Sequence, residues 1–194
     1  AFAYLIGIPL GVILVITRRD GICPAPKTNA VLGTIVNIMR SVPLLILIIV
    51  LIPYTRLVAG TSIGATATIV PLIVGAAPFI ARMVESSLLE VDAGVVEAAQ
   101  AMGASPWQIV TKVLLKESVP SLVTGAAIAL TTILGYSAMA GAVGGGGLGA
   151  LAIKYGYHRY QTDVLLLTLI ILVLLVQVIQ ALGNAVAKRI DHRK

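Results

Sequence analysis

Five long apolar runs alternate with short polar segments along this chain of 194 residues. A helix needs about 20 mostly apolar residues to cross the hydrocarbon core of a membrane. The runs that reach or approach this length are Ala1–Ile16, Val31–Ile52, Ser62–Ala81, Val119–Val143 and Val164–Ala187. The pattern predicts an all-α polytopic membrane protein with five transmembrane helices. The first run is short and has no positive charge before it, so we interpret it as a truncated first helix and not as a signal peptide.

The polar segment from Arg82 to Glu117 differs from the rest of the chain in its charge. It contains five of the eight acidic residues, Glu85, Glu90, Asp92, Glu97 and Glu117. Charged side chains are costly inside a membrane, so they gather where the protein meets water or a soluble partner. We therefore interpret residues 82–117 as a docking surface for a soluble protein.

Local signals within this segment predict two helices separated by a sharp turn. Asp92 is suited to cap a helix over residues 93–102, and Gly103 is suited to the left-handed position that ends it. Ser105, Pro106 and Gln108 then match the cap, first turn and capping-box partner of a second helix. The first helix is too short and too polar to span a membrane, so we expect it to lie at the membrane surface.

The composition changes this picture little. A chain that is 58% hydrophobic and 11% charged lies outside the range of soluble globular domains. No long soluble stretch remains, so residues 1–194 are expected to form a single transmembrane domain that contains the loop 82–117. Cys23 is the only cysteine, which rules out an intrachain disulfide.

The net charge of +6 indicates orientation and not a nucleic-acid partner. With the N-terminus outside, the outer segments hold only Arg56, Lys154 and Arg159. The inner segments hold Arg18, Arg19, Lys27, Arg82, Lys112, Lys116, Lys188, Arg189, Arg193 and Lys194. An excess of basic residues on the cytoplasmic side is the usual rule for membrane proteins. The charges therefore predict cytoplasmic loops at residues 17–30 and 82–117 and a cytoplasmic C-terminus.

Arg40 is the one charge well inside an apolar run, which makes it a candidate functional intramembrane charge. The alternative is that it lies at the inner membrane interface and reaches the lipid headgroups. Four prolines also fall within apolar runs, where they either serve packing or allow helices to bend during transport: Pro9, Pro43, Pro71 and Pro78.

The pattern Glu97-Ala98-Ala99, three residues and Gly103 resembles the EAA loop of ABC-importer permeases. The family pattern continues with isoleucine, leucine and proline, where this chain has Val113, Leu115 and Lys116. Lys116 in place of proline means that the helix need not break there, although Pro120 follows closely. The resemblance assigns coupling to an ATPase to Glu97, Ala98, Ala99, Gly103, Ala104, Ser105 and Pro106.

Three further stretches resemble the permease of bacterial methionine importers, and the similarity covers nearly the whole chain. They are residues 36–43 (VNIMRSVP), 74–85 (VGAAPFIARMVE) and 135–144 (GYSAMAGAVG). The resemblance implies a homodimer in the bacterial inner membrane, surrounded by membrane lipid. Its other partners would be two copies of an ATPase subunit and an extracytoplasmic substrate-binding protein. ATP and magnesium would be bound by the ATPase, so no cofactor is expected in this chain.

The glycine run from Gly144 to Gly149 formally matches the dinucleotide-binding pattern G-x-G-x-x-G. It follows a membrane helix and not a strand, so we reject that interpretation. An outer loop with unusual backbone dihedrals or part of an external gate remain the two alternatives. The chain also lacks a P-loop, so it is not expected to hydrolyse ATP.

Met139, beside Tyr136 and Ser137, is a candidate gate or translocation-path residue because a flexible thioether near a helix end suits such a role. On residue type alone, a packing methionine is the commoner case, and only the family resemblance raises the candidate. The rival function is an ion-coupled secondary transporter or channel. Such proteins usually carry acidic residues or inverted repeats in their spans, and the five apolar runs show neither.

Overall fold

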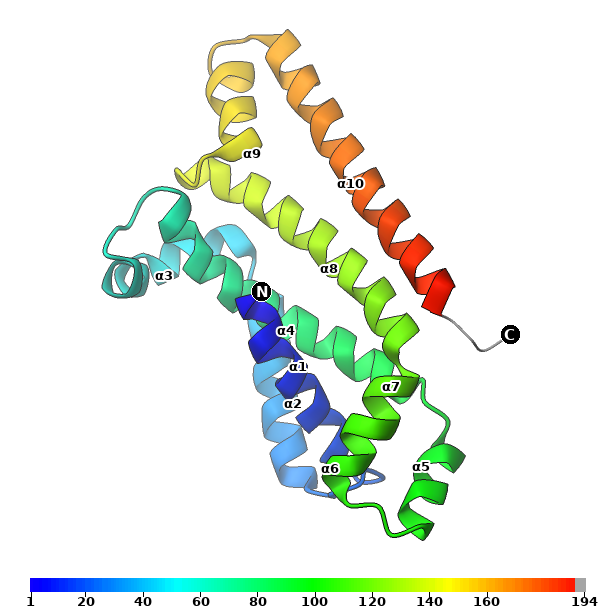
Figure 1. Cartoon of the computed structure of the whole chain (residues 1–194). Helices are drawn as coiled ribbons and strands as arrows, with labels where there is room; N and C mark the ends of the chain where they lie inside the picture. The colour runs from blue at the N-terminus through cyan, green and yellow to red at the C-terminus, as the bar shows by residue number, and fades with distance from the viewer. Residues whose placement is uncertain (191–194) are drawn as a thin grey trace. The chain divides into compact units, whose positions relative to one another are not determined.

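The computed structural model describes residues 1–190, and within them it consists of helices joined by short turns (Figure 1). Arg193 and Lys194, which the sequence assigns to the inner side, lie outside the described residues. The elements are α1 (Phe2–Ile16), α2 (Pro26–Ser41), α3 (Leu44–Ala59), α4 (Ala65–Leu89), α5 (Ala93–Ala101), α6 (Pro106–Gln108), η1 (Ile109–Leu114), α7 (Leu115–Glu117), α8 (Val119–Ala140), η2 (Gly141–Val143), α9 (Gly147–Leu151), η3 (Ala152–Tyr157) and α10 (Thr162–Ile190). Of these, η1 and η3 are π-helices and η2 is a 3-10 helix.

Three helical segments are long and apolar enough to cross a membrane: Ala65–Leu89, Val119–Val143 and Thr162–Ile190. They correspond to the last three predicted spans, and α1 is a shorter apolar helix where the first was expected. The second predicted span, residues 31–52, is not one helix but the pair α2 and α3, which are bent by 104° relative to each other. Pro43 is the N-cap of α3, and its ring disfavours helical backbone in the residue before it. The chain therefore breaks there and does not merely kink.

The other three prolines lie inside helices, Pro9 in α1 and Pro71 and Pro78 in α4. Helix α4 continues eight residues beyond the predicted end at Ala81 and reaches Leu89. The first part of the segment expected to be a loop, including Arg82 and Glu85, is therefore helical.

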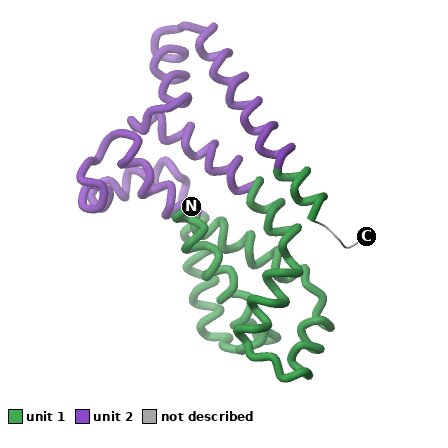
Figure 2. The backbone as a smooth tube through the Cα atoms, viewed as in Figure 1, with its two compact units in different colours: residues 1–40, 77–127, 183–194 green, residues 41–76, 128–182 purple. Residues whose placement is uncertain are grey.

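The chain divides into two compact units (Figure 2). The first unit comprises Ala1–Arg40, Ala77–Ala127 and the chain from Gly183 on, and the second comprises Ser41–Ala76 and Ile128–Leu182. Helices α4, α8 and α10 each contribute residues to both units. The whole polar segment from Arg82 to Glu117 belongs to the first unit.

The first unit is held together by close packing of α1 against α4. A Cβ atom at Gly7 would lie 2.6 Å from Cγ2 of Ile80, so only glycine permits this approach. The polar contact at the end of α1 comes from Asn29, whose Nδ2 donates to the carbonyl of Leu14 at 2.6 Å and to Oγ1 of Thr17 at 3.0 Å. Asn29 thus supplies a donor to the carbonyl of Leu14, which lies in the last turn of α1, where carbonyls lack helical partners.

The second unit has a small core in which Leu44 and Ile48 of α3 pack with Ala140 of α8. The glycine run beside it has unusual dihedrals, one of the two alternatives that the sequence left open, with positive φ at Gly144, Gly146 and Gly147. Farther along, a Cβ atom at Gly149 would collide with the backbone of Ala138. Glycine is therefore required where the chain turns back from α8 into α9.

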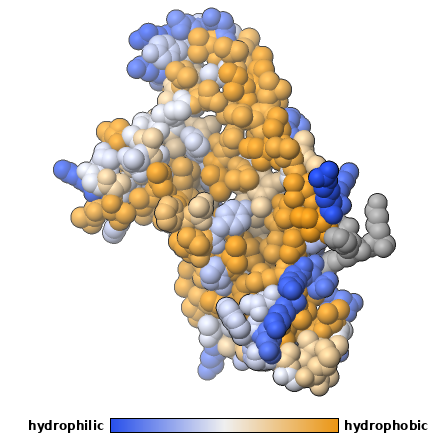
Figure 3. All heavy atoms as spheres, viewed as in Figure 1, coloured by the Kyte–Doolittle hydropathy of each residue, from blue (hydrophilic) through white to orange (hydrophobic). Residues whose placement is uncertain are grey.

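Apolar side chains cover most of the face seen in Figure 3, and hydrophilic residues gather at the turn between η3 and α10. Helix α10 has exposed large hydrophobic side chains all around its circumference, among them Leu166, Leu167, Leu169 and Ile170. In water such a surface would be unfavourable, but in a bilayer it is the surface that meets lipid or other membrane helices.

Candidate functional site

The candidate docking segment is the part of the polar segment from Asp92 to Gln108. It begins with α5, a helix of nine residues and about 14 Å in length. Its N-cap is Asp92, whose carboxylate accepts a hydrogen bond from the backbone N–H of Gly94 at 2.7 Å. This bond satisfies a donor that the first turn leaves without a helical partner. The cap predicted from the sequence is confirmed.

The C-terminal end of α5 is a Schellman turn centred on Gly103. The N–H of Gly103 donates to the carbonyl of Gln100 at 2.9 Å, and the N–H of Ala104 donates to the carbonyl of Ala99 at 3.1 Å. Gly103 has a φ of 78°, in the left-handed region that favours glycine. No atom lies within 4 Å of where its Cβ would be, so the requirement for glycine comes from the backbone conformation and not from crowding.

The next helix starts with the complete capping box that the sequence predicts. The N–H of Gln108 donates to Oγ of Ser105 at 3.3 Å, and the N–H of Ser105 donates to Oε1 of Gln108 at 2.8 Å. Pro106 occupies the first turn, where its missing N–H costs nothing. The chain stays helical through Lys116, where the family pattern has proline, and the break comes at Ser118, just before Pro120 in the first turn of α8.

Segment η1 anchors this site to the first unit. Ile109, Val110 and Leu114 are buried, and α5 packs against η1. Ala99 is also buried, with 5% of its surface exposed, whereas Glu97 and Ala98 are exposed. The two alanines of the motif therefore do different things: Ala99 allows α5 to pack closely, and Ala98 is free to meet a partner.

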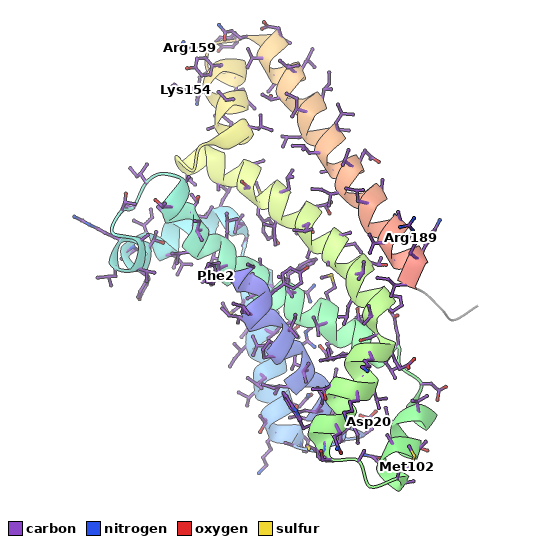
Figure 4. All side chains as sticks on the ribbon, viewed as in Figure 1. Phe2, Asp20, Met102, Lys154, Arg159 and Arg189 are labelled. Atoms are coloured by element: carbon purple, nitrogen blue, oxygen red, sulfur yellow. The ribbon has the colours of Figure 1, made fainter. Side chains whose placement is uncertain are left out.

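Exposed apolar side chains flank the turn on both sides. Met102 is 82% exposed at the end of α5, where Figure 4 shows it at the tip of the segment, and Trp107 is 75% exposed after the capping box. The predicted coupling residues Gly103, Ser105 and Pro106 are exposed between them, and Ala104 is half-buried. Met102 and Trp107 are not among the residues predicted from the sequence, although a large apolar residue on each side of a polar turn is a recognisable signal for a contact surface.

A cavity of about 330 Å³ separates α5 from the loop that follows α1. Glu97 and Gln100 line it from α5, and Arg18 and Asp20 line it from the loop. Nε of Arg18 donates to Oδ1 of Asp20 at 3.2 Å. The backbone N–H of Asp20 and then the Arg18 guanidinium hold the pKa of Asp20 below its ordinary value. Glu97 and Arg18 thus line the same cavity, and Arg18 is already paired with Asp20.

Arg82 of α4 makes three hydrogen bonds, one within its own helix and two to α2. One nitrogen, Nη1, donates to Oε2 of Glu85 at 2.6 Å. The other, Nη2, donates to the carbonyl of Gly33 at 3.0 Å and to Oδ1 of Asn37 at 2.9 Å. From the sequence, Arg82 is recognisable only as an inner positive charge, because its partners on α2 are 45 and 49 residues away in the chain.

The remaining candidate residues lie outside this site. Arg40 is exposed in the last turn of α2, next to the bend into α3, so it is not in the middle of a straight span. Tyr136 packs against the core of the second unit, while Ser137 and Met139 are exposed on α8. The docking segment belongs to the first unit and these α8 residues to the second.

Residues 7–194 match the family described as binding-protein-dependent transport system inner membrane component. The chain is 53% identical over 193 residues to a Vibrio cholerae protein named probable D-methionine transport system permease protein MetI, covering 100% of this chain and 86% of the relative. It is 56% identical over 140 residues to the Escherichia coli D-methionine transport system permease protein MetI, covering 72% of this chain and 64% of the relative.

Solved structures agree with this similarity. The chain superposes with a TM-score of 0.97 and 51% identity on a chain of the MetNI methionine ABC transporter in an inward-facing conformation, covering 98% of this chain and 88% of that chain. It superposes with a TM-score of 0.75 on a chain of an amino acid ABC transporter, at 19% identity, covering 97% of this chain and 87% of that chain, which shows a common fold.

Proposed function

The chain belongs to the family of inner-membrane components of binding-protein-dependent transport systems, and on this premise we propose that it forms the membrane path for methionine. It is a permease subunit of an ATP-driven importer and not an enzyme, because the ATPase of such a system is a separate subunit. Family membership therefore excludes the ion-coupled transporter considered above. The assembly contains two copies of this chain, two ATPase subunits that bind ATP and magnesium, and an extracytoplasmic binding protein.

The segment from Asp92 to Gln108 is the part of the permease that contacts the ATPase on the cytoplasmic side. The observation that supports this assignment is the contrast within α5, where Ala99 is buried against η1 while Ala98 and Met102 are exposed. One face is fixed to the permease and the other is free for a partner. Movement of the ATPase would pass through η1 and α7 directly into α8.

Met139 and Ser137 line the translocation path in this proposal, and Tyr136 positions that face of α8. Their exposure in a helix that crosses the membrane supports the assignment, since a polar Ser137 is unfavourable against lipid. Arg40, at the corner between α2 and α3, serves as an interfacial residue and not as a charge at the centre of the membrane. It stays a prediction that residues 1–194 form a single permease domain.

Replacement of Gly103 by valine tests the coupling role. Valine in a left-handed conformation costs about 2 kcal/mol, so the turn after α5 will change shape. We expect ATP hydrolysis by the complete assembly to continue while methionine uptake per ATP falls about tenfold, the size of a typical coupling energy between sites. Both rates are measured in proteoliposomes that contain the permease, the ATPase and the binding protein.

Gly60 provides the matched control for this experiment. It ends α3 with a φ of 71°, and no atom lies within 4 Å of its Cβ position. Gly60→Val therefore introduces the same local strain at a site outside the docking segment. Normal coupling in Gly103→Val, or equal loss of coupling in both variants, would contradict the proposed role of the segment.

A further inference from the structure

An apolar groove of about 400 Å³ lies between α1 and the segment from Pro106 to Leu115, entirely within the first unit. One wall is a stripe of α1 side chains at helical spacing, Ile8, Val12 and Ile16. The other wall is a second stripe, Trp107, Thr111 and Leu115. Figure 1 shows that α1 and the segment from α6 to α7 run in opposite directions, so the C-terminal end of α1 and the start of α6 lie toward the same end of the groove.

The groove offers little to a polar ligand. The one hydroxyl in its lining, Oγ1 of Thr111, already donates to the carbonyl of Trp107 at 2.7 Å. The other side chains that line it are aliphatic, proline or indole. The walls of such a site offer few hydrogen-bond partners to water, so the site favours a hydrocarbon occupant.

The surroundings of the groove point to lipid and not to protein. Its α1 wall continues into side chains that are exposed on the same helix, Phe2, Leu5 and Ile8, with Leu5 70% exposed. Figure 4 shows Phe2 at the start of α1. In an inner-membrane permease such a surface is in contact with acyl chains, and the groove is a hollow in that surface.

Charged and amphipathic groups mark one end of the groove as the headgroup side. Trp107 is 75% exposed there, and tryptophan is enriched at the interface between membrane and water. Arg19 follows Ile16 by three residues and is exposed. Within residues 1–190 no carboxylate lies within ion-pairing distance of Arg19, whereas Arg18 is paired with Asp20. Arg19 is therefore available to a phosphate.

We propose that this groove binds one acyl chain of an anionic phospholipid of the inner leaflet, with the headgroup between Arg19 and Trp107. The bound lipid fills the space between α1 and the segment that follows the capping box. It thereby supports the docking segment from the membrane side. The proposal goes beyond the transport function and does not depend on which substrate is carried.

Lipid retention by the assembled transporter tests the proposal. The complex is purified from membranes containing phosphatidylglycerol and phosphatidylcholine in equal amounts, and the lipids that remain bound are weighed by native mass spectrometry. We expect one retained lipid for each permease chain, with phosphatidylglycerol favoured about fivefold, as expected for one basic residue near a headgroup. Complexes that retain no lipid would overturn the proposal.

Variants that fill the groove identify the site. Val12→Trp and Leu115→Trp each fill it from one wall and are expected to abolish retention, while Val178→Trp on the exposed surface of α10 leaves it unchanged. Arg19→Gln is expected to keep the lipid and lose the preference for phosphatidylglycerol. Retention of lipid by both Val12→Trp and Leu115→Trp would show that the lipid does not bind in this groove. An unchanged preference for phosphatidylglycerol in Arg19→Gln would show that Arg19 does not select an anionic headgroup.

A measurement on the wild-type complex removes any dependence on the folding of these variants. Phosphatidylglycerol with a photoreactive diazirine in its acyl chain is added to the complex and activated. Labelling of peptides that contain Val12 or Val110 is the expected result. Labelling confined to α10 would overturn the proposal, as would crosslinks that show another protein chain in the groove.

Discussion

The side chain of Arg82 makes three hydrogen bonds. Its guanidinium binds a carboxylate on its own helix and two oxygens on α2, and its Nε is buried without a partner. The side chain of Glu85 is only 13% exposed. A partly buried pair of this kind stabilises little relative to apolar packing, but removal of one member leaves the other charge partly buried and unpaired.

Arg82→Ala is therefore expected to destabilise the permease by about 3 kcal/mol, because Glu85, Asn37 and the Gly33 carbonyl all lose a donor. The thermal unfolding midpoint of the purified complex measures this effect. Arg40→Ala is the control, since Arg40 is exposed and is expected to change the midpoint little. Similar midpoints for the two variants would show that the contacts of Arg82 contribute nothing measurable.

At the scale of elements, α8 has two exposed faces, and a comparison of them tests which face lines the translocation path. Met139 and Leu130 are each 50% exposed, and nine residues at about 100° per residue place them on opposite sides of the helix. They are therefore matched in exposure and differ in direction. If the translocation path follows the Met139 face of α8, Met139 is in contact with water and Leu130 is in contact with lipid.

Cysteine accessibility distinguishes these faces in a Cys23→Ser background, which removes the only native thiol. We expect a water-soluble thiol reagent to modify Met139→Cys in membranes and to leave Leu130→Cys unmodified. The rate of modification of Met139→Cys should fall when methionine is being transported. Equal modification of both cysteines would remove Met139 from the path.

The elements also show what the sequence could and could not predict. The caps at Asp92 and Ser105 and the turn at Gly103 are each formed by hydrogen bonds between residues no more than five positions apart. The local sequence pattern was therefore sufficient to predict each of them. The bend between α2 and α3 was underestimated, because an apolar run on both sides of Pro43 hides a break in the backbone. The contacts of Arg82 were missed, because the pairing of distant helices leaves no mark in a single sequence.

For the whole molecule, the substrate is the property that needs measurement. The segment from Val119 to Val143 contains no charged residue, so it offers no counter-charge to a substrate with a charged side chain. We expect the complete assembly to take up labelled D-methionine with ATP and binding protein present. Unlabelled glutamate and lysine should compete poorly, and strong competition by either would contradict an uncharged side chain as the feature that the path accepts.

Three helices contribute to both compact units, and each changes unit at small residues. The boundaries fall at Ala76–Ala77, after Ala127 and before Gly183, and a Cβ atom at Gly183 would collide with that of Ala127. Small side chains let helix backbones approach each other closely. Gly183 and Ala127 both belong to the first unit, so this close approach joins the C-terminal part of α10 to α8 within that unit, and a displacement of α8 that starts at the docking segment would carry the end of α10 with it.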